Sequence, residues 1–230
     1  MKTVQRVIVA FEYILITTTV CYIFLSLYDT LKAKGYITKA ILLYFLLVSS
    51  YYYLSILVKK DVHILPNTEI KGLCRKCNKL RCTRTFHCDT CNLCFYKRDH
   101  HCPWLAKCIS SSNYREYYFF ILFTVIYLSL KVLCGCLYVN QIVFLNNYLL
   151  TILSFFFIWT NFLLFIDKTS IEYYKSRKRL NVSRYFWQEI DFCVCFDRLY
   201  EVLFDREIMN VLIMFFPFLQ KRTSIIEGSI

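Results

Sequence analysis

The sequence predicts an all-α membrane protein with four transmembrane helices and a loop-rich, cysteine-rich module between the second and third helices. Three observations support this fold class. Of the 230 residues, 57% are hydrophobic and 19% are aromatic, with only four Gly and three Pro, which is unusual for a soluble domain. Four apolar runs are long enough to cross a bilayer. Eight of the 13 cysteines lie in one 35-residue segment between two of those runs.

The four apolar runs each contain the roughly 20 residues that a helix needs to span a membrane. They cover residues 7–28, 40–58, 117–139 and 148–166. A cleaved signal peptide is disfavoured for the first run, because its apolar stretch exceeds the roughly 7–15 residues of a signal sequence and no small-residue cleavage site follows. Burial of all four runs inside a soluble protein is also disfavoured, because two of them are paired across short loops.

The distribution of Lys and Arg predicts the orientation of the helices. If both termini and residues 59–115 share one side, that side holds 24 of the 28 Lys and Arg residues. The connection at 29–39 holds three, and the connection at 140–147 holds none. By the positive-inside rule, both termini and the module are expected to be cytosolic. The net charge of +12 is interpreted as serving attraction to anionic lipid headgroups and to a phosphate-bearing ligand. Binding to nucleic acid is therefore not expected.

This layout divides the chain into four segments. They are the N-terminus with the first two helices (1–58), the cytosolic module (59–115), the third and fourth helices (116–167) and a cytosolic tail (168–230). The module is expected to consist of turns, because its apolar residues are too sparse to build a core. The tail combines basic and aromatic residues, which suits either a segment lying on the membrane surface or a small helical tail packed on the module.

Within the module, residues 74–108 contain eleven potential metal ligands, eight Cys and three His. Gaps of two residues separate three pairs of cysteines, at 74–77, 88–91 and 91–94. This spacing lets both thiolates of a pair reach one tetrahedral Zn²⁺ at about 2.3 Å. Disulfides are not expected on a reducing side of the membrane. Two closed zinc sites use eight ligands, so three groups are left over.

Two of the three leftover groups form a possible catalytic set. Residues 99–102 read Asp-His-His-Cys. Here Cys102 has a neighbouring base in His100, and Asp99 can orient that base, as expected for an activated thiol nucleophile. The third leftover group is Cys82, to which spacing alone gives no role. Spacing alone also leaves the division of the individual zinc ligands open.

The segment from Cys74 onward resembles the DHHC cysteine-rich domain of protein palmitoyltransferases. The match covers about 45 residues, includes the spacing of all the cysteines and histidines, and continues through Pro103, Trp104 and Asn113. The four-helix layout is also similar to that family. Residues 61–66 resemble its Asp-Pro-Gly element without the Pro and Gly. Residues 169–172 resemble its Thr-Thr-x-Glu element with one Thr replaced by Ser.

The sequence also departs from the family pattern at several positions. Cys82 stands where the family usually has Pro, Ala106 and Lys107 replace an Asn pair, Ser110 replaces Gly, and Tyr117 replaces Phe. None of these changes removes a ligand or a catalytic group.

The resemblance implies two structural zinc ions and a protein-cysteine S-palmitoyltransferase activity. The two implied ligand sets are Cys74, Cys77, His87 and Cys94 for one zinc, and Cys88, Cys91, His101 and Cys108 for the other. Cys102 would be the acylated nucleophile, with His100 as base and Asp99 orienting the imidazole. A fatty acyl group such as palmitate would pass from acyl-coenzyme A (palmitoyl-CoA) through a Cys102 thioester to cysteines of membrane-associated proteins. The implied location is the endoplasmic reticulum or the Golgi.

The alternative is a non-catalytic zinc-binding membrane scaffold or regulatory subunit. Residues 99–102 favour the enzyme, because a scaffold does not need a spare thiol beside a base. A RING-like ligase does not fit the ligand series, and a channel would need polar residues recurring within several helices. The need for an accessory subunit and the residues that bind the donor stay open.

Two charges lie inside predicted helices, Glu12 and Lys131, and each has either a partner in the protein or a path to the membrane surface.

Overall fold

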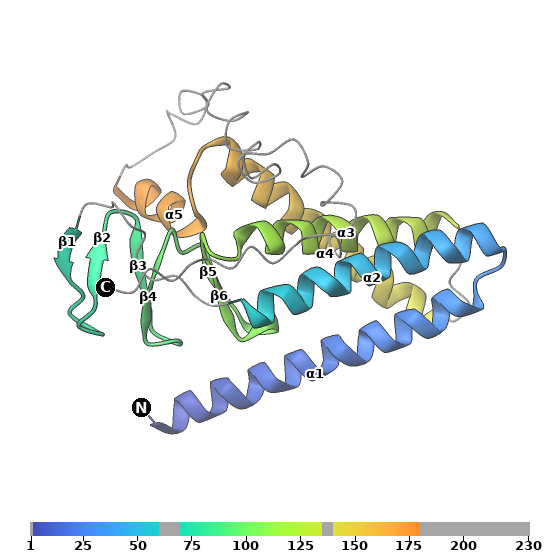
Figure 1. Ribbon diagram of the computed structural model, residues 1–230, viewed down its shortest axis with the longest axis horizontal. Coiled ribbons are helices and arrows are strands. Elements are labelled where there is room, and N and C mark those ends of the chain that lie inside the picture. The colour runs from blue at the N-terminus through green and yellow to red at the C-terminus, as the bar shows by residue number, and fades with distance from the viewer. Residues whose placement is uncertain (1, 60–69, 135–139, 180–230) are drawn as a thin grey trace, which may run out of the picture.

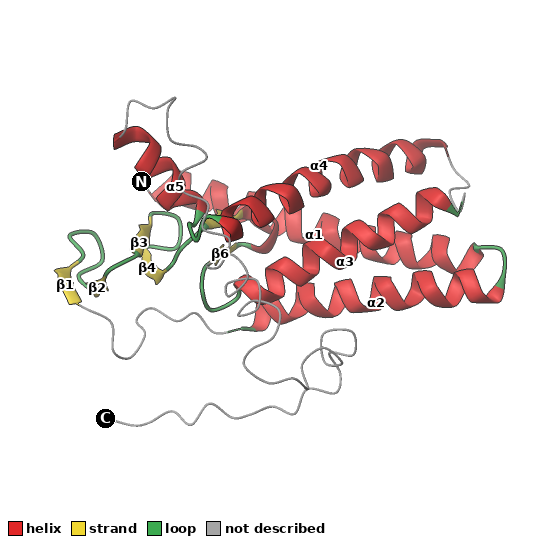
Figure 2. Ribbon diagram, turned by 90° about the horizontal axis from the view of Figure 1, so that it is seen from above, coloured by secondary structure: helices red, strands yellow, loops and turns green. Residues whose placement is uncertain are grey.

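Four long helices lie side by side, and three small β-hairpins lie at one end of them in this computed structural model, which describes residues 2–59, 70–134 and 140–179 (Figures 1 and 2). The long helices are α1 (Lys2–Lys32), α2 (Tyr36–Val58), α3 (Tyr114–Leu133) and α4 (Asn140–Phe165). All four are long and apolar enough to cross a membrane, judged by length and composition. The predicted fold class is confirmed.

The central pair of helices is α2 and α3. In their most apolar windows, 39% and 44% of the residues are buried, against 6% and 11% in α1 and α4. α2 packs against α3, which packs against α4, while α1 packs against α2. The outward faces expose large apolar side chains such as Phe24, Phe155 and Ile158. A soluble monomer rarely exposes so much contiguous apolar surface, whereas lipid can cover it.

The first connection is shorter than the sequence suggested, because α1 continues through Asp29 into the bundle. The Nζ of Lys131, which is fully buried in α3, donates to Oδ2 of Asp29 at 3.2 Å. Beside this pair, the hydroxyl groups of Thr30 and Tyr127 lie 2.9 Å apart. The charge of Lys131 therefore has an acidic partner inside the protein, as is usual for ionisable groups within membrane segments.

The prediction of a loop at 140–147 is wrong, because α4 begins at Asn140. Within this stretch, Asn146 is fully buried and its Oδ1 accepts a hydrogen bond of 2.5 Å from the hydroxyl of Tyr22 in α1. The Oδ1 of this polar residue, which was predicted to lie in a loop, thus accepts a hydrogen bond from another helix inside the bundle. The third apolar run was expected to continue to residue 139. α3 ends at Leu133 instead, and residues 135–139 lie outside the described part of the chain.

The described part of the module consists of three antiparallel hairpins. β1 (Ile70–Leu73) pairs with β2 (Leu80–Cys82), β3 (Thr85–Cys88) with β4 (Leu93–Tyr96), and β5 (His100–Cys102) with β6 (Lys107–Ile109) through the short helix η1 (Pro103–Leu105). The strands have three or four residues, and the module's own buried apolar cluster is small, formed by Cys88, Phe95 and Cys108. Isolated hairpins of this size are only marginally stable in water. Interactions other than the burial of their own apolar side chains must therefore stabilise them.

The hairpins, the N-terminal end of α1 and the short helix α5 (Ser170–Arg179) lie at the same end of the bundle (Figure 1). The element expected at 61–66 and the tail beyond residue 179 lie outside the described residues.

The end of η1 contains a strained residue that offers a stability prediction. Ala106 has a left-handed backbone, with φ 47° and ψ 37°, which costs a residue with a Cβ roughly 1–2 kcal/mol, whereas glycine adopts it freely. Ala106→Gly is therefore expected to stabilise the protein by about 1 kcal/mol, measured as a higher midpoint of thermal unfolding in detergent. Ala40→Gly, an exposed site within α2, is the matched control and should lower the midpoint. A lower midpoint for Ala106→Gly would contradict the prediction.

Candidate functional site

Two sets of four Cys and His side chains come together within the hairpins. The first cluster is Cys74, Cys77, His87 and Cys94, and the second cluster is Cys88, Cys91, His101 and Cys108. In each cluster, the potential ligand atoms all lie within 4.8 Å of one another. The resemblance to the DHHC domain led us to expect the same two sets. The β3–β4 hairpin supplies two ligands to each cluster, so the two clusters interleave along the chain. The first cluster takes one residue from each strand, and the second takes Cys88 from β3 and Cys91 from the turn.

The sulfur atoms are spaced as a tetrahedral zinc site requires. The Sγ atoms of Cys77 and Cys94 lie 3.6 Å apart, and those of Cys91 and Cys108 lie 3.7 Å apart. Two sulfurs that each lie about 2.3 Å from a tetrahedral zinc are about 3.8 Å apart. The residues present in both clusters therefore fit a structural zinc ion.

The two histidines present the same ring nitrogen to their clusters. The Nδ1 of His87 lies 3.7 Å from a sulfur of the first cluster, and the Nδ1 of His101 lies 3.3 Å from a sulfur of the second. Each Nε2 then points away from the cluster and faces a carboxylate. These carboxylates are Asp89 at 3.5 Å from His87 and Glu12 of α1 at 2.6 Å from His101.

The catalytic candidates lie where the hairpins meet the helices. The Nδ1 of His100 lies 2.7 Å from Oδ2 of Asp99. Cys102 is buried in an apolar cluster that includes Tyr53 of α2 and Tyr117 of α3. The Tyr117 ring also meets the His100 ring edge-on, with centroids 5.4 Å apart. The structure thus brings the three predicted residues together beside the transmembrane helices.

The electrostatics of His100 favour its charged form. Burial of the imidazole opposes a positive charge. Hydrogen bonds to the Asp99 carboxylate and the Cys102 thiol, and the negative charge of these groups, outweigh burial and raise the pKa of His100 to about 9. An imidazole with such partners is a strong proton acceptor for the neighbouring thiol.

The start of α5 holds Asp99 from the other side. The backbone N–H of Ser170 donates to Oδ1 of Asp99 at 2.6 Å, and the Ser170 hydroxyl donates to Oδ2 at 3.1 Å. Thr169 and Glu172 form a capping box, in which each residue's backbone N–H donates to the other's side chain, at 2.9 and 3.3 Å. The element at 169–172 therefore starts the helix and directs Ser170 at Asp99.

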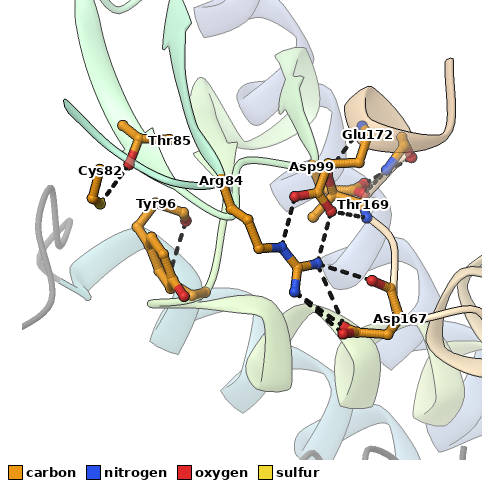
Figure 3. A network of polar contacts seen from close by, with 10 residues as sticks. Cys82, Arg84, Thr85, Tyr96, Asp99, Asp167, Thr169 and Glu172 are labelled. Carbon is orange, nitrogen blue, oxygen red and sulfur yellow. Dashed lines mark hydrogen bonds and ion pairs between the residues drawn. The ribbon is translucent and has the colours of Figure 1, made fainter. Parts of the chain in front are cut away.

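Arg84 connects the hairpins to α5 (Figure 3). Its guanidinium donates to both carboxylate oxygens of Glu172 at 2.7 Å and to the backbone carbonyl of Asp167 at 2.9 Å. Although burial opposes its charge, these acidic partners raise the pKa of Arg84. The sequence did not identify Arg84 as a site residue, because it lies 88 residues from Glu172 and no motif links them.

The comparison with known families agrees with this geometry. Residues 67–177 match the family model described as DHHC palmitoyltransferase. These residues form a DHHC palmitoyltransferase domain. The match includes both clusters, the Asp99–Cys102 segment, α3, α4 and most of α5.

This chain is also similar to several curated proteins. It is 38% identical to palmitoyltransferase ZDHHC15 of Homo sapiens over 86 residues, which cover 37% of this chain and 23% of that protein. It is 45% identical to palmitoyltransferase pfa3 of Emericella nidulans over 51 residues, which cover 22% of this chain and 10% of that protein. Probable protein S-acyltransferase 13 of Arabidopsis thaliana is 41% identical over 51 residues, 22% of this chain and 17% of that protein. The matched segments span less than a quarter of each relative.

Two departures of this DHHC domain from the family pattern have local structural roles. Cys82 belongs to neither cluster. It is buried, and its Sγ lies 2.8 Å from the hydroxyl oxygen of Thr85 in the next strand (Figure 3). The ammonium group of Lys107 donates to the backbone carbonyl of Lys59, just after α2. These contacts join neighbouring parts of the module and connect the module to α2.

Proposed function

We propose that this chain is a protein S-acyltransferase, which moves a fatty acyl group such as palmitate from acyl-coenzyme A to cysteines of other proteins through a thioester on Cys102. One observation carries the proposal. Cys102 lies beside the His100–Asp99 pair and is packed against apolar side chains of α2 and α3. A non-catalytic scaffold would gain nothing from a spare thiol in this position.

In the proposed reaction, His100 removes the proton from the Cys102 thiol, because an unperturbed thiol is only a few per cent ionised at pH 7. Asp99 holds Nδ1 of the imidazole, so Nε2 is the atom that accepts the proton. The thiolate attacks the thioester carbonyl of the donor, a new carbon–sulfur bond forms, and coenzyme A leaves with the proton from His100. A substrate thiol then takes the acyl group from Cys102 by the same exchange. One thioester replaces another, so no energy input is needed.

The two clusters would each hold one structural zinc. Bound zinc would cross-link the hairpins and fix the strand β5 that carries Cys102. The proposal is supported by the sulfur spacing in both clusters and by the small apolar core of the module.

A basic pocket supports the choice of an acyl-coenzyme A donor. The pocket has a volume of about 530 Å³ and lies between the first hairpins and α5. Its lining includes five cationic side chains, which are Lys71, Arg81, Arg84, Lys168 and Lys175. Its two carboxylates, Asp167 and Glu172, are paired with Arg84. Such a pocket suits the phosphates of the coenzyme, while the apolar neighbours of Cys102 suit the acyl chain.

The proposal includes a cytosolic module, with both termini on the same side of an endoplasmic reticulum or Golgi membrane. The distribution of Lys and Arg supports this orientation, and so does the position of the N-terminal end of α1, the hairpins and α5 at one end of the bundle (Figure 1). In this proposal, residues 59–115 are the cytosolic module, residues 1–58 and 116–167 anchor it, and residues 168–230 form the tail. Membrane-associated proteins with accessible cysteines are the substrates.

The test is to incubate the detergent-purified, zinc-retaining protein with alkyne-tagged palmitoyl-coenzyme A and to map the label by mass spectrometry. A label on Cys102 that neutral hydroxylamine removes is expected, because hydroxylamine cleaves thioesters. Transfer of that label to a cysteine-containing peptide or protein completes the proposed cycle. No label on zinc-replete protein, even with candidate partner subunits added, would support the scaffold instead.

The Ser170 hydroxyl provides a graded test of the His100–Asp99 pair. Ser170→Ala removes one hydrogen bond to the Asp99 carboxylate and keeps the bond from the backbone N–H. A hydrogen bond to a charged group contributes about 1.5–3 kcal/mol, so the initial rate of Cys102 labelling is expected to fall about tenfold or more. Ser170→Thr keeps the hydroxyl and should label close to the wild-type rate. Ser111→Ala removes a serine hydroxyl that donates to the backbone carbonyl of Tyr96 and serves as the control. Equal rates for Ser170→Ala and Ser111→Ala would contradict the prediction.

A further inference from the structure

Glu12 is an acidic residue in the apolar first helix whose side chain is directed into the module. It is 6% exposed, and its Oε1 lies 2.6 Å from Nε2 of His101. The two residues are 89 positions apart in the chain. A charged side chain in a membrane helix is unfavourable without a partner. His101 is such a partner, so Glu12 does not need to extend to the membrane surface.

The orientation of the His101 ring determines what this contact can do. Nδ1 lies 3.7, 3.3 and 3.7 Å from the sulfurs of Cys88, Cys91 and Cys108. When Nδ1 coordinates a metal with its lone pair, the proton of the neutral imidazole must lie on Nε2. That N–H then donates to the carboxylate of Glu12. A histidine ligand that donates its second N–H to a carboxylate has its tautomer and its ring orientation fixed, and it becomes a stronger ligand.

We propose that Glu12 is a positioning residue for the second cluster, in which a carboxylate from the first transmembrane helix selects the metal-binding tautomer of His101. This inference rests on the zinc role proposed above. His101 directly precedes Cys102, and it pairs with Cys108 across the β5–β6 hairpin. The hydrogen bond therefore joins α1 to the strand that carries the nucleophile. α1 also packs against η1, which follows Cys102, so the contact is part of a wider interface.

The first cluster differs in a way that makes the proposal testable. Its histidine, His87, also faces a carboxylate, but Asp89 lies 3.5 Å away and its side chain is 75% exposed. Asp89 also pairs with Lys76 at the surface. Water and Lys76 compete for this carboxylate, whereas the side chain of Glu12 is only 8% exposed. The loss of Glu12 is therefore expected to weaken its zinc site far more than the loss of Asp89.

The experiment measures zinc directly in the purified full-length protein in detergent. Zinc content is determined by atomic spectrometry, and zinc release is followed with a chromogenic chelator. Wild type is expected to hold two zinc ions. In Glu12→Ala, one of the two is expected to be released about 10–100 times faster, the range typical for loss of such a partner. Asp89→Asn is the matched control, with a change of no more than about fivefold, as for an exposed ion pair.

Two further variants separate positioning from simple packing. Glu12→Gln keeps the volume of the side chain and an acceptor oxygen but loses the charge, so it should fold and give an intermediate release rate. Glu12→Asp restores the carboxylate and should release zinc more slowly than Glu12→Gln. In cobalt-substituted protein, the visible ligand-field spectrum should change in Glu12→Gln and stay unchanged in Asp89→Asn. If only the volume of the side chain mattered, Glu12→Asp, which is one methylene shorter than Glu, would release zinc faster than Glu12→Gln.

Each outcome has a distinct meaning. If zinc-supplemented wild type holds no zinc, the proposed zinc role fails and the inference fails with it. If wild type holds two zinc ions and Glu12→Gln and Glu12→Ala release both at the wild-type rate, only the role of Glu12 is overturned.

Discussion

Cys102→Ser is expected to abolish the hydroxylamine-sensitive label from palmitoyl-coenzyme A, with a loss of at least about a thousandfold, as typical for removal of a nucleophile. The substitution changes one atom, so the apolar contacts of this side chain with Tyr53 and Tyr117 are kept. A serine hydroxyl is a much weaker acid than a thiol, and the imidazole of His100 cannot produce a comparable nucleophile from it. The initial rate of labelling, followed in gel, is the measurement.

The control must account for thiols that react with acyl-coenzyme A without catalysis. Cys21 and Cys134 are exposed on α1 and just after α3, where acyl chains would gather. The double variant Cys21→Ser with Cys134→Ser is expected to label at the wild-type rate. His100→Ala keeps the Cys102 thiol and removes the base, so its rate should fall by about 100-fold or more. A thioester label that persists in Cys102→Ser would overturn the role of this residue.

The sequence was sufficient to predict the features that depend on local patterns. Each transmembrane helix is an apolar run of sufficient length, and the Cys-x-x-Cys pairs place two ligands near each other whatever the rest of the chain does. The Asp-His-His-Cys segment is also local, since Asp99 and Cys102 are three residues apart. The segment has eleven potential ligands and two zinc sites need only eight, and spacing alone does not assign individual ligands to sites. The division of eight ligands into two clusters therefore required the resemblance to a family.

Contacts between distant segments could not be predicted, because no periodicity or spacing connects their partners. His101 meets Glu12 from 89 residues away, Arg84 meets Glu172 from 88, and Lys131 meets Asp29 from 102. For Glu12 and Lys131, the sequence shows only a charge inside an apolar run, and for Arg84 it shows nothing unusual. A charge inside an apolar run indicates either a partner in the protein or a path to the membrane surface, and only the packing of the elements decides between them. The predicted loop at 140–147 was wrong for the same reason, since Asn146 finds its partner in another helix.

Replacing one ligand of the second cluster is expected to unfold the hairpins. In Cys88→Ser, the cluster loses a thiolate that sits in the centre of the module, because Cys88 also packs against Phe95 and Cys108. The strands have three or four residues and the apolar cluster within the module is small, so the proposed zinc ions would supply most of the stability of the hairpins. Structural zinc in small zinc-binding peptides contributes about 10–16 kcal/mol, far more than such hairpins gain from burial.

Zinc content and limited proteolysis of the full-length protein test this prediction. Cys88→Ser is expected to lose at least one zinc and to be cleaved rapidly within residues 70–113, while far-UV circular dichroism still reports the transmembrane helices. The matched control is Cys82→Ser, since Cys82 is equally buried in the same module but belongs to neither cluster. It should keep both zinc ions and resist cleavage as wild type does. Because β3–β4 supplies ligands to both clusters, release of the second zinc is also expected to weaken the first. Retention of a protease-resistant module in Cys88→Ser would mean that the hairpins are held by packing against α2, α3 and α5 and not by the metal.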